Sequence, residues 1–440
     1  MLFYFFYYLF ALCLNLILSF CFMPESNSSK TYILPPDTPD SIVPKAVIRE
    51  GWLLFILAIV QFTHIIDFVI MMPLGPQLMR VFSISPKQFG LLVSAYTFAA
   101  AISGFISTFF IDKFDRKNAL LALYFGFIVG TFCCAIAPNY QILMLARVLA
   151  GAFGGVIGAL VFSIIGDVVP EHRRGSATGK VMAAFSAASI IGIPVGLYLA
   201  SLSSWHAPFY ALAGLSLLVL FIALKFLPTM RGHLTNAVQQ NPVKLVLEII
   251  TNRNLVWALL LMIMLTLAGF TVVPFISPYM VGNIGFAETE LAFIYLCGGL
   301  ASVITSQLAG KLADKYGKQR VFIYSAIFSI IPILLVTNMP RVPHYLALII
   351  TTSFFIGFGA RFVPAVSLLT SSVEKRLRGS FMSFQSSVQQ LASGLSAFIS
   401  GLIIQKTAAG EILHFNIVGI IACIATVICM FIITRLKVVS

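Results

Sequence analysis

The chain has 440 residues, of which 59% are hydrophobic and only 10% are charged, whereas an ordinary soluble domain has about 45 to 50% apolar and about 25% charged residues. With a mean hydropathy of +0.99, the polar side chains are too few to cover a globule of this size, which excludes a soluble fold. The net charge of +13 does not indicate nucleic-acid binding, because the 28 Lys and Arg residues stand in short clusters between long apolar runs. These features predict an all-α integral membrane protein.

The first 50 residues fall into two parts. Residues 1–23 form a hydrophobic extension that is long enough to cross a bilayer but has neither the positive start nor the cleavage site of a secretory signal. Two alternatives stay open: an extra span that begins outside, or translation that starts at Met23 and leaves the segment out of the native product. Residues 24–50 are rich in Ser, Pro and Asp toward their start, and we expect a flexible cytoplasmic tail.

Apolar runs bounded by charged residues, Pro, Gly or Asn predict twelve membrane spans of about 20 residues or more. Six lie in an N-terminal half, 51–227, and six in a C-terminal half, 254–434, joined by a central cytoplasmic loop at 228–253. The predicted spans are 51–73, 89–111, 119–137, 141–165, 180–202, 208–227, 254–276, 289–310, 321–338, 344–370, 380–404 and 415–434.

The basic residues are distributed very unevenly between the two sides of these spans. The segment before the first span, the loops near 113, 174, 240, 315 and 376, and the end of the chain carry 22 of the 28 Lys and Arg residues. Since positively charged loops stay in the cytoplasm, we expect both ends of the twelve-span core to be cytoplasmic in a bacterial inner membrane. The opposite side has only Arg80, Lys87, Arg341 and Lys406.

The seven cysteines indicate no special chemistry. All of them lie inside apolar stretches, without the spacing of metal ligands and without a neighbouring His. We therefore expect free thiols, with neither a disulfide framework nor a metal site, and no cofactor.

Two short motifs occur once in each half. Residues 111–114 (IDKF) correspond to 313–316 (ADKY) with offsets of about 202, and Arg174-Gly175-Ser176 corresponds to Arg378-Gly379-Ser380 at an offset of 204. Each copy lies in the loop after the second or fourth span of its half. Two parallel six-helix repeats are an arrangement that secondary transporters use.

With these motifs the chain resembles the major facilitator superfamily over residues 50–435. The loop signature of that family is nearly complete at 310–318 (GKLADKYGK), while the first copy at 108–117 (TFFIDKFDRK) has Thr108 and Asp115 where the family usually has Gly. The resemblance implies twelve transmembrane helices in two six-helix halves around a central cavity. Residues 143–151 (LMLARVLAG) are similar to the fourth-helix motif of the drug:proton antiporter branch, which includes arabinose-efflux permeases.

Glycines in two spans predict local helix geometry. The run Gly151, Gly154, Gly155 and Gly158 has the small-xxx-small spacing of close helix packing, and no strand precedes it that would make it a nucleotide loop. The fifth-helix antiporter signature is reduced here to Gly192, Pro194 and Gly196, without the usual adjacent Gly-Pro. We expect these three residues to form a kink that lets backbones approach at a gate.

Asp67 is the one carboxylate well inside a span, so it is a candidate for proton coupling; the alternative is a structural salt bridge. It lies about 24 Å from the cytoplasmic start of its span and Arg147 about 9 Å from the outer end of the fourth. In a hydrocarbon layer of about 30 Å these depths are similar, so the two can pair. His64, one turn before Asp67, can share its proton or simply be a hydrogen-bonded packing residue.

Three more intramembrane polar residues are candidates for the cavity. The resemblance implies that helices one, four, seven and ten line it, which places Arg361 there with Asp67 and Arg147. The alternative for Arg361 is a snorkelling or carbonyl-bonded residue. Gln385 and Gln389, four residues apart on the eleventh span, form a polar stripe that either binds substrate or joins helices.

The repeated loops carry acids beside basic residues at helix ends. Charge-assisted bonds of Asp112, Arg116, Asp314 and Lys315 can form a latch that closes the cytoplasmic face. The alternative is a solvated loop whose charges only set the topology.

We therefore expect a proton-coupled exporter of small amphiphilic molecules that works by alternating access as a monomer, with protons, lipid and a small-molecule substrate as its partners. A transporter of an anionic metabolite or lipid is the alternative, because the membrane spans contain two buried Arg residues but only one buried Asp. A third class is a non-transporting sensor or scaffold, but a protein of that class would usually have an additional soluble domain. The sequence has no second catalytic group near Asp67, so we expect no enzyme.

Overall fold

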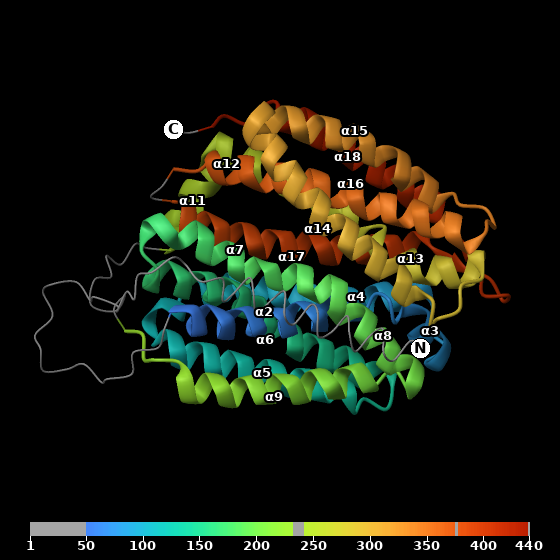
Figure 1. The fold of residues 1–440 in the computed structure, drawn as a ribbon, viewed down its shortest axis with the longest axis horizontal. Helices are drawn as coiled ribbons and strands as arrows, with labels where there is room; N and C mark the ends of the chain where they lie inside the picture. The colour runs from blue at the N-terminus through green and yellow to red at the C-terminus, as the bar shows by residue number, and fades with distance from the viewer. Residues whose placement is uncertain (1–49, 232–241, 375–376, 439–440) are drawn as a thin grey trace, which may run out of the picture.

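The computed structural model describes residues 50–438 except 232–241 and 375–376, and consists almost entirely of helices that run side by side along one axis (Figure 1). The hydrophobic extension 1–23 and nearly all of the tail lie outside the described residues. Within the described part, eleven helices are long and apolar enough to cross a membrane. The remaining predicted span, the eleventh, corresponds to helix α17, Arg378–Ile403, which is 26 residues long but more polar than the others.

The helices of the N-terminal half begin and end near the predicted spans. The fifth span is interrupted, because a π-helical turn joins its two helices. The elements are α2 (Glu50–Ile70), α3 (Gly75–Val81), α4 (Pro86–Ser107), the 3₁₀ turn η1 (Ile111–Lys113), α5 (Arg116–Ala135), α6 (Tyr140–Val168), α7 (Glu171–Ala187), the π turn η2 (Ala188–Gly192), α8 (Ile193–Leu202) and α9 (Ala207–Phe226).

The C-terminal half follows a short helix in the central loop and ends with a small hairpin before the last span. Its two strands are antiparallel, with Gln405 opposite Leu413. The elements are α11 (Pro242–Thr251), α12 (Arg253–Phe270), α13 (Val273–Tyr279), the π turn η3 (Met280–Ile284), α14 (Leu291–Tyr316), α15 (Lys318–Thr337), α16 (His344–Ser371), α17, β1 (Gln405–Lys406), β2 (Ile412–Leu413) and α18 (Phe415–Ile433).

Polar residues between the apolar runs start several helices by capping them. Ser85 forms a capping box with Gln88 at the start of α4. Asp115, Asn139 and Asn252 accept hydrogen bonds from the first free backbone N–H groups of α5, α6 and α12. Such caps stabilise a helix end by about 1 kcal/mol each, which explains why hydropathy locates these boundaries well.

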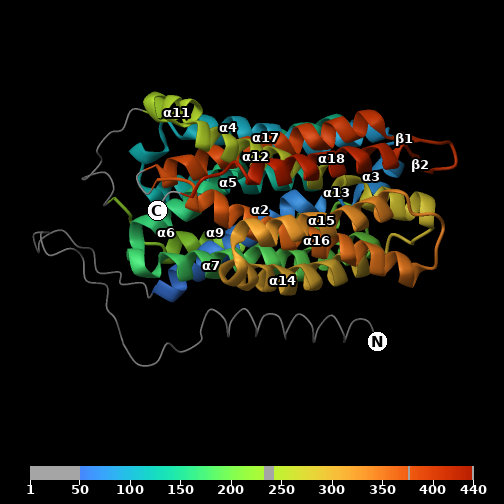
Figure 2. The ribbon, with the colours of Figure 1, turned by 90° about the horizontal axis from the view of Figure 1, so that it is seen from above.

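The two halves meet mainly along α4 and α17, which lie side by side (Figure 2). Glycines bring these helices into close contact. A methyl group at Gly90 would lie 2.7 Å from the main-chain oxygen of Ala397, and one at Gly401 would lie 2.8 Å from that of Pro86. Helix α14 of the C-terminal half also packs against η2 and α8 of the N-terminal half. This is a second contact between the halves.

The buried side chains are arranged differently at the two ends of the bundle. We call the end with the loops near 113, 174 and 315 the basic end, and the other the opposite end. At the opposite end, buried residues of both halves form one continuous cluster that includes Ile70 and Phe275. At the basic end each half has a cluster of its own. The structure is therefore closed at the opposite end.

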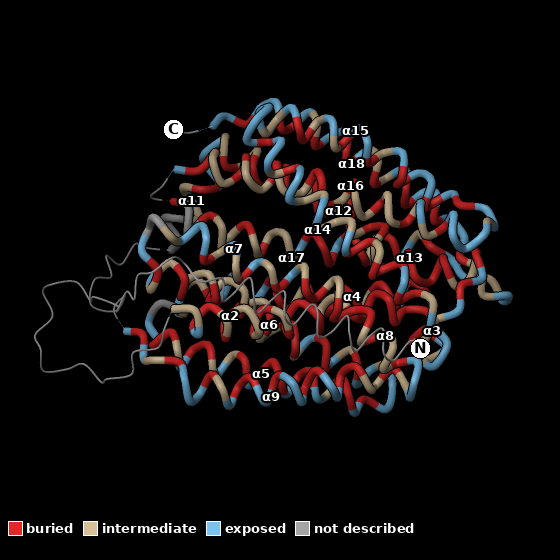
Figure 3. The backbone as a smooth tube through the Cα atoms, in the orientation of Figure 1, coloured by how far each residue is buried: buried red, intermediate tan, exposed pale blue. Residues whose placement is uncertain are grey.

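Many residues on the outer helix faces are exposed (Figure 3), and large apolar side chains are among them. Leu218, Ile304 and Ile331 are 57%, 61% and 60% exposed. Apolar faces of this extent are covered by lipid in a membrane protein. The burial pattern thus agrees with the integral membrane fold that composition predicts.

Candidate functional site

A buried ion pair links the first and fourth spans. Nη1 of Arg147 on α6 lies 2.8 Å from Oδ2 of Asp67 on α2, and also donates to the main-chain oxygen of Asp67 at 3.1 Å. Thr131 on α5 donates to Oδ1 of Asp67 at 3.1 Å. The side chains of Asp67 and Arg147 have no exposed surface. The pairing that the depth argument predicts is present, and Asp67 holds three helices of the N-terminal half together.

Aromatic rings connect this pair to the other half. The guanidinium carbon of Arg147 lies 4.4 Å from the centre of the Tyr96 ring on α4, within the range of a cation–π interaction. Phe68 stacks on Tyr96 at 5.4 Å and on Phe270 of α12 at 5.9 Å between ring centres. Two ring contacts therefore connect the buried pair to the interface between the halves.

Next to the pair lie buried polar groups whose hydrogen bonds are not satisfied by the described residues. They are both ring nitrogens of His64 and the hydroxyl of Tyr96, and Oε1 of Gln61 is unsatisfied one turn before His64 on α2. The His64 ring lies 5.9 Å from that of Phe127 and 6.5 Å from that of Tyr96. Buried polar atoms of native proteins are almost always hydrogen-bonded to protein or water. Unsatisfied polar groups therefore lie close to the buried pair.

Glycines of α6 make room for these groups. A methyl group at Gly154 would collide with the Tyr96 hydroxyl and lie 3.1 Å from Cδ2 of His64. One at Gly151 would collide with the backbone of Tyr96. The prediction of close helix packing is confirmed at these positions, and Gly154 also borders the polar site.

Arg361 on α16 is buried within the C-terminal half. Its Nη1 donates to the hydroxyls of Thr426 at 2.8 Å and Ser329 at 3.3 Å, and its Nη2 donates to the main-chain oxygen of Ala268 at 3.2 Å. These acceptors belong to α18, α15 and α12. The structure records no ion pair with a described carboxylate. In this conformation Arg361 joins three neighbouring helices, as the carbonyl-bonded alternative expects.

The two glutamines of the predicted polar stripe contact each other. Nε2 of Gln385 donates to Oε1 of Gln389 at 3.3 Å, and Gln385 is buried. The stripe is therefore present on α17. Its role in binding substrate stays a prediction.

The break in the fifth span lies at the predicted kink. The π-helical turn η2 ends at Gly192, and Pro194 lies in the first turn of α8. Because Pro has no backbone N–H group, it leaves a carbonyl of the preceding turn free, which a π turn accommodates. A methyl group at Gly192 would collide with Ile66, and one at Gly196 would lie 2.6 Å from Cδ1 of Ile70. η2 and α8 therefore pack closely against α2, and a bend of the helix at these residues stays a prediction.

The predicted latch residues lie at the basic end but are not all joined. Nε of Arg116 lies 2.9 Å from Oδ2 of Asp167 at the end of α6. Asp314 is exposed and forms no recorded bond with another described residue. The ammonium group of Lys315 lies 5.1 Å from the ring centre of its neighbour Tyr316. The side chain of Asp112 lies outside the described residues.

Two carboxylates at this end were not singled out from the sequence. Oδ2 of Asp115 lies 3.1 Å from Nε of Arg231, and its Oδ1 accepts from the backbone of Met230 at 3.4 Å. Asp115 therefore ties the start of the central loop to the N-terminal half. The available signal was the acidic side chain at a position where the family usually has Gly. Asp167 carried no comparable signal.

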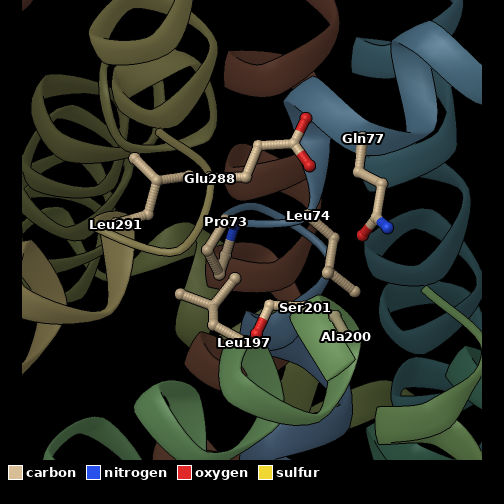
Figure 4. A pocket seen from close by; sticks show the side chains of 8 residues that line it. All are labelled: Pro73, Leu74, Gln77, Leu197, Ala200, Ser201, Glu288 and Leu291. Carbon is tan, nitrogen blue, oxygen red and sulfur yellow. The ribbon is translucent and has the colours of Figure 1, made fainter. Parts of the chain in front are cut away.

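At the opposite end a small pocket lies between the halves (Figure 4). Its volume is about 20 Å³, which is room for about one water molecule. Arg80, at the end of α3, forms an ion pair with Glu288, just before α14. The pocket is lined by Pro73, Leu74, Gln77, Leu197, Ala200, Ser201, Glu288 and Leu291.

Similarity to solved structures agrees with this architecture. The structure of a D-xylose-proton symporter matches with a TM-score of 0.72 at 16% identity, covering 86% of this chain and 96% of that one. A bacterial homologue of the human lysosomal transporter Spinster, in an inward-facing conformation, matches with a TM-score of 0.68 at 17% identity over 80% of this chain and 82% of that one. At such identities the similarity concerns the fold.

The sequence itself also matches a known family. The uncharacterized MFS-type transporter YceJ of Bacillus subtilis is 25% identical over 81% of this chain and 89% of its own length. A probable sugar efflux transporter of Helicobacter pylori is 24% identical over 57% of this chain and 63% of its own length. The family model described as Major Facilitator Superfamily matches residues 57–280 and 258–439. The chain is therefore a multi-pass membrane transporter of the major facilitator superfamily.

Proposed function

We propose that this transporter is coupled to protons and exports small amphiphilic compounds by alternating access. The observation that carries the proposal is the fully buried ion pair of Asp67 and Arg147. A carboxylate in such a place either neutralises the arginine or takes up a proton, and when it is protonated it no longer attracts the guanidinium. Asp67 thus has two states that differ in how firmly α2 and α6 are joined.

The ring contacts give this switch a mechanical effect. Release of Arg147 from Asp67 changes the partner of the Tyr96 ring, and Phe68 links Tyr96 to Phe270 in the other half. Proton binding and the relative position of the halves therefore influence each other. In our proposal His64 passes the proton to Asp67 through water held by the unsatisfied polar groups around it.

The proposal includes a topology. The loops of the basic end are cytoplasmic, because most Lys and Arg residues lie there, and α17 crosses the membrane as the eleventh of twelve spans. The chain acts as a monomer in a bacterial inner membrane. The name of the Helicobacter pylori relative, a probable sugar efflux transporter, supports export as the direction.

Transport by the purified protein in liposomes tests the proposal. Asp67→Asn keeps the shape of the side chain but cannot gain or lose a proton. We expect it to abolish accumulation driven by a proton gradient over a panel of amphiphilic solutes, while exchange of solute without a gradient continues. Glu374→Gln, which changes an exposed glutamate near the basic end that is not one of the predicted latch residues, is the matched control. Full proton-driven transport by Asp67→Asn would refute proton coupling at this residue, and transport of no solute by the wild type would favour a sensor or scaffold.

A further inference from the structure

We propose that the phosphate of an anionic phospholipid binds in a groove at the opposite end and joins the two halves there. The groove has a volume of about 770 Å³, within the range of small-molecule sites. It lies between α3 and the start of α4 in the N-terminal half and the end of α17 with β1 in the C-terminal half. Figure 2 shows α3 and the β1–β2 hairpin at this same end of the α4–α17 pair.

The charge in this groove is unusual for its side of the molecule. Of the four basic residues that the sequence assigns to the opposite end, Arg80, Lys87 and Lys406 line the groove. None of the described residues lining it is acidic. Arg80 is paired with Glu288, whereas Lys87 and Lys406 are exposed and form no recorded ion pair with a described residue. Two unneutralised cations thus border one groove.

These cations come from different halves, Lys87 from α4 and Lys406 from β1. Like charges that border one cavity repel each other and attract an anion between them. A lysine ammonium group binds phosphate as a point charge and does not need the planar geometry that arginine offers to carboxylates. The shared chemistry of the ligand is therefore a phosphate monoanion that contacts both ammonium groups.

The surroundings of the groove favour a lipid over free phosphate. Leu402 lines the groove and is 50% exposed. Leu391, Leu395 and Ile399 are 44%, 44% and 36% exposed, and their spacing places them on the same face of α17 as Leu402. This apolar face leads from the groove along the span, where an acyl chain can lie. The source of the phosphate is thus a lipid of the outer leaflet, which rests on the topology proposed above.

Binding here would affect the transport cycle. A methyl group at Gly401 would lie 3.3 Å from Cα of Lys87, so the groove adjoins a close contact of α4 with α17. Opening the opposite end would move Lys406 away from Lys87. A phosphate bound by both therefore stabilises the state that is closed at this end.

Lipid binding can be measured without substrate or proton gradient, so its failure is distinguishable from failure of the proposed transport function. The protein is placed in nanodiscs of phosphatidylcholine with an equal amount of phosphatidylglycerol, and retained lipid is counted by native mass spectrometry. We expect K87Q/K406Q to retain phosphatidylglycerol about tenfold less, which corresponds to about 1.4 kcal/mol, and K87R/K406R to retain it as the wild type does. Arg341→Gln, which removes the fourth basic residue of this end, is the matched control.

A second readout follows the conformation. Spin labels at Val81 and Leu413, both exposed at this end in different halves, should show a larger closed population with phosphatidylglycerol than with phosphatidylcholine alone, and no such difference in K87Q/K406Q. Equal retention of both lipids, or unchanged retention by K87Q/K406Q, would overturn the site. Displacement of the lipid by millimolar glycerol phosphate would show that the groove binds free phosphate and would overturn the lipid assignment.

Discussion

Arg80 and Glu288 form an ion pair that crosses from the N-terminal half to the C-terminal half at the closed end of the bundle. The two side chains are 64% and 26% exposed. Exposed ion pairs contribute about 0.2 to 1 kcal/mol. This contact therefore assists closure without being able to hold the end shut alone.

Glu288→Gln should raise the population that is open at the opposite end by no more than about fivefold, since 1 kcal/mol corresponds to about that factor. Distance measurements between spin labels on the two halves would check it. Glu411→Gln is the control, because Glu411 pairs with Arg341 at the same end but inside one half. If both variants shift the population equally, the crossing contact has no special role.

Arg147→Ala should lower the stability of the protein less than removal of the aspartate by Asp67→Ala. Both break the buried pair, which costs about 3 to 5 kcal/mol when one charge is left alone. Arginine remains charged in every condition, whereas an aspartate can take up a proton to become neutral. Thermal unfolding of the two single variants and of the double variant would measure the difference. Equal loss in both would contradict this account.

Gly154→Ala should impair transport, because the added methyl group would push against the Tyr96 hydroxyl and the ring of His64. Overpacking of this kind costs about 1 to 3 kcal/mol. Gly166→Ala on the same helix meets nothing within 4 Å and should leave the rate unchanged. Initial rates in liposomes at matched protein content test the pair. Equal rates for both variants would show that the polar site does not depend on this spacing.

Arg361→Ala should lower stability, since Arg361 is hydrogen-bonded to three neighbouring helices. Binding of matched anionic, neutral and cationic analogues to wild type and variant separates the two interpretations of this residue. Equal weakening for all three analogues is the expected result for a residue that joins helices. A selective loss for the anion, with partial recovery in Arg361→Lys, would instead favour an anionic substrate.

A single cysteine at Gln240 in the central loop should react with a membrane-impermeant thiol reagent only after the cells are opened. The stretch from 225 to 253, which includes this loop, carries four basic residues, and such loops stay in the cytoplasm. The labelling has to be done in a background without the native cysteines. Reaction from outside intact cells would reverse the proposed topology.

The depth of a residue in the membrane could be predicted from the sequence. The direction in which its side chain points around the helix axis could not. Counting residues from the span ends placed Asp67 and Arg147 at similar depth, and they are paired. The same counting placed Arg361 in the tenth span but did not show that it turns toward α12, α15 and α18. These spans are apolar nearly all round, so hydropathy has no periodic component that indicates which face is inside.

Contacts between residues far apart in the sequence could not be predicted either. Asp115 caps its own helix, which its position before an apolar run suggests. Its bonds with Met230 and Arg231 join residues more than a hundred positions apart. Such pairs depend on how the helices are arranged, and a single sequence contains no direct signal of that.

The hydrophobic cluster that both halves share at the opposite end determines how much free energy is needed to open that end. Opening that end would transfer apolar surface to water at about 25 cal/mol per Å², so about 200 Å² of newly wetted surface corresponds to about 5 kcal/mol. One elementary charge moving through about 100 mV releases about 2.3 kcal/mol. A single proton at that voltage would supply about half of this amount, and the remainder has to come from apolar surface that is buried as the basic end closes and from the substrate that fills the space. An empty carrier would therefore rest with this end closed, and in the proton-coupled cycle proposed above this would prevent a leak of protons.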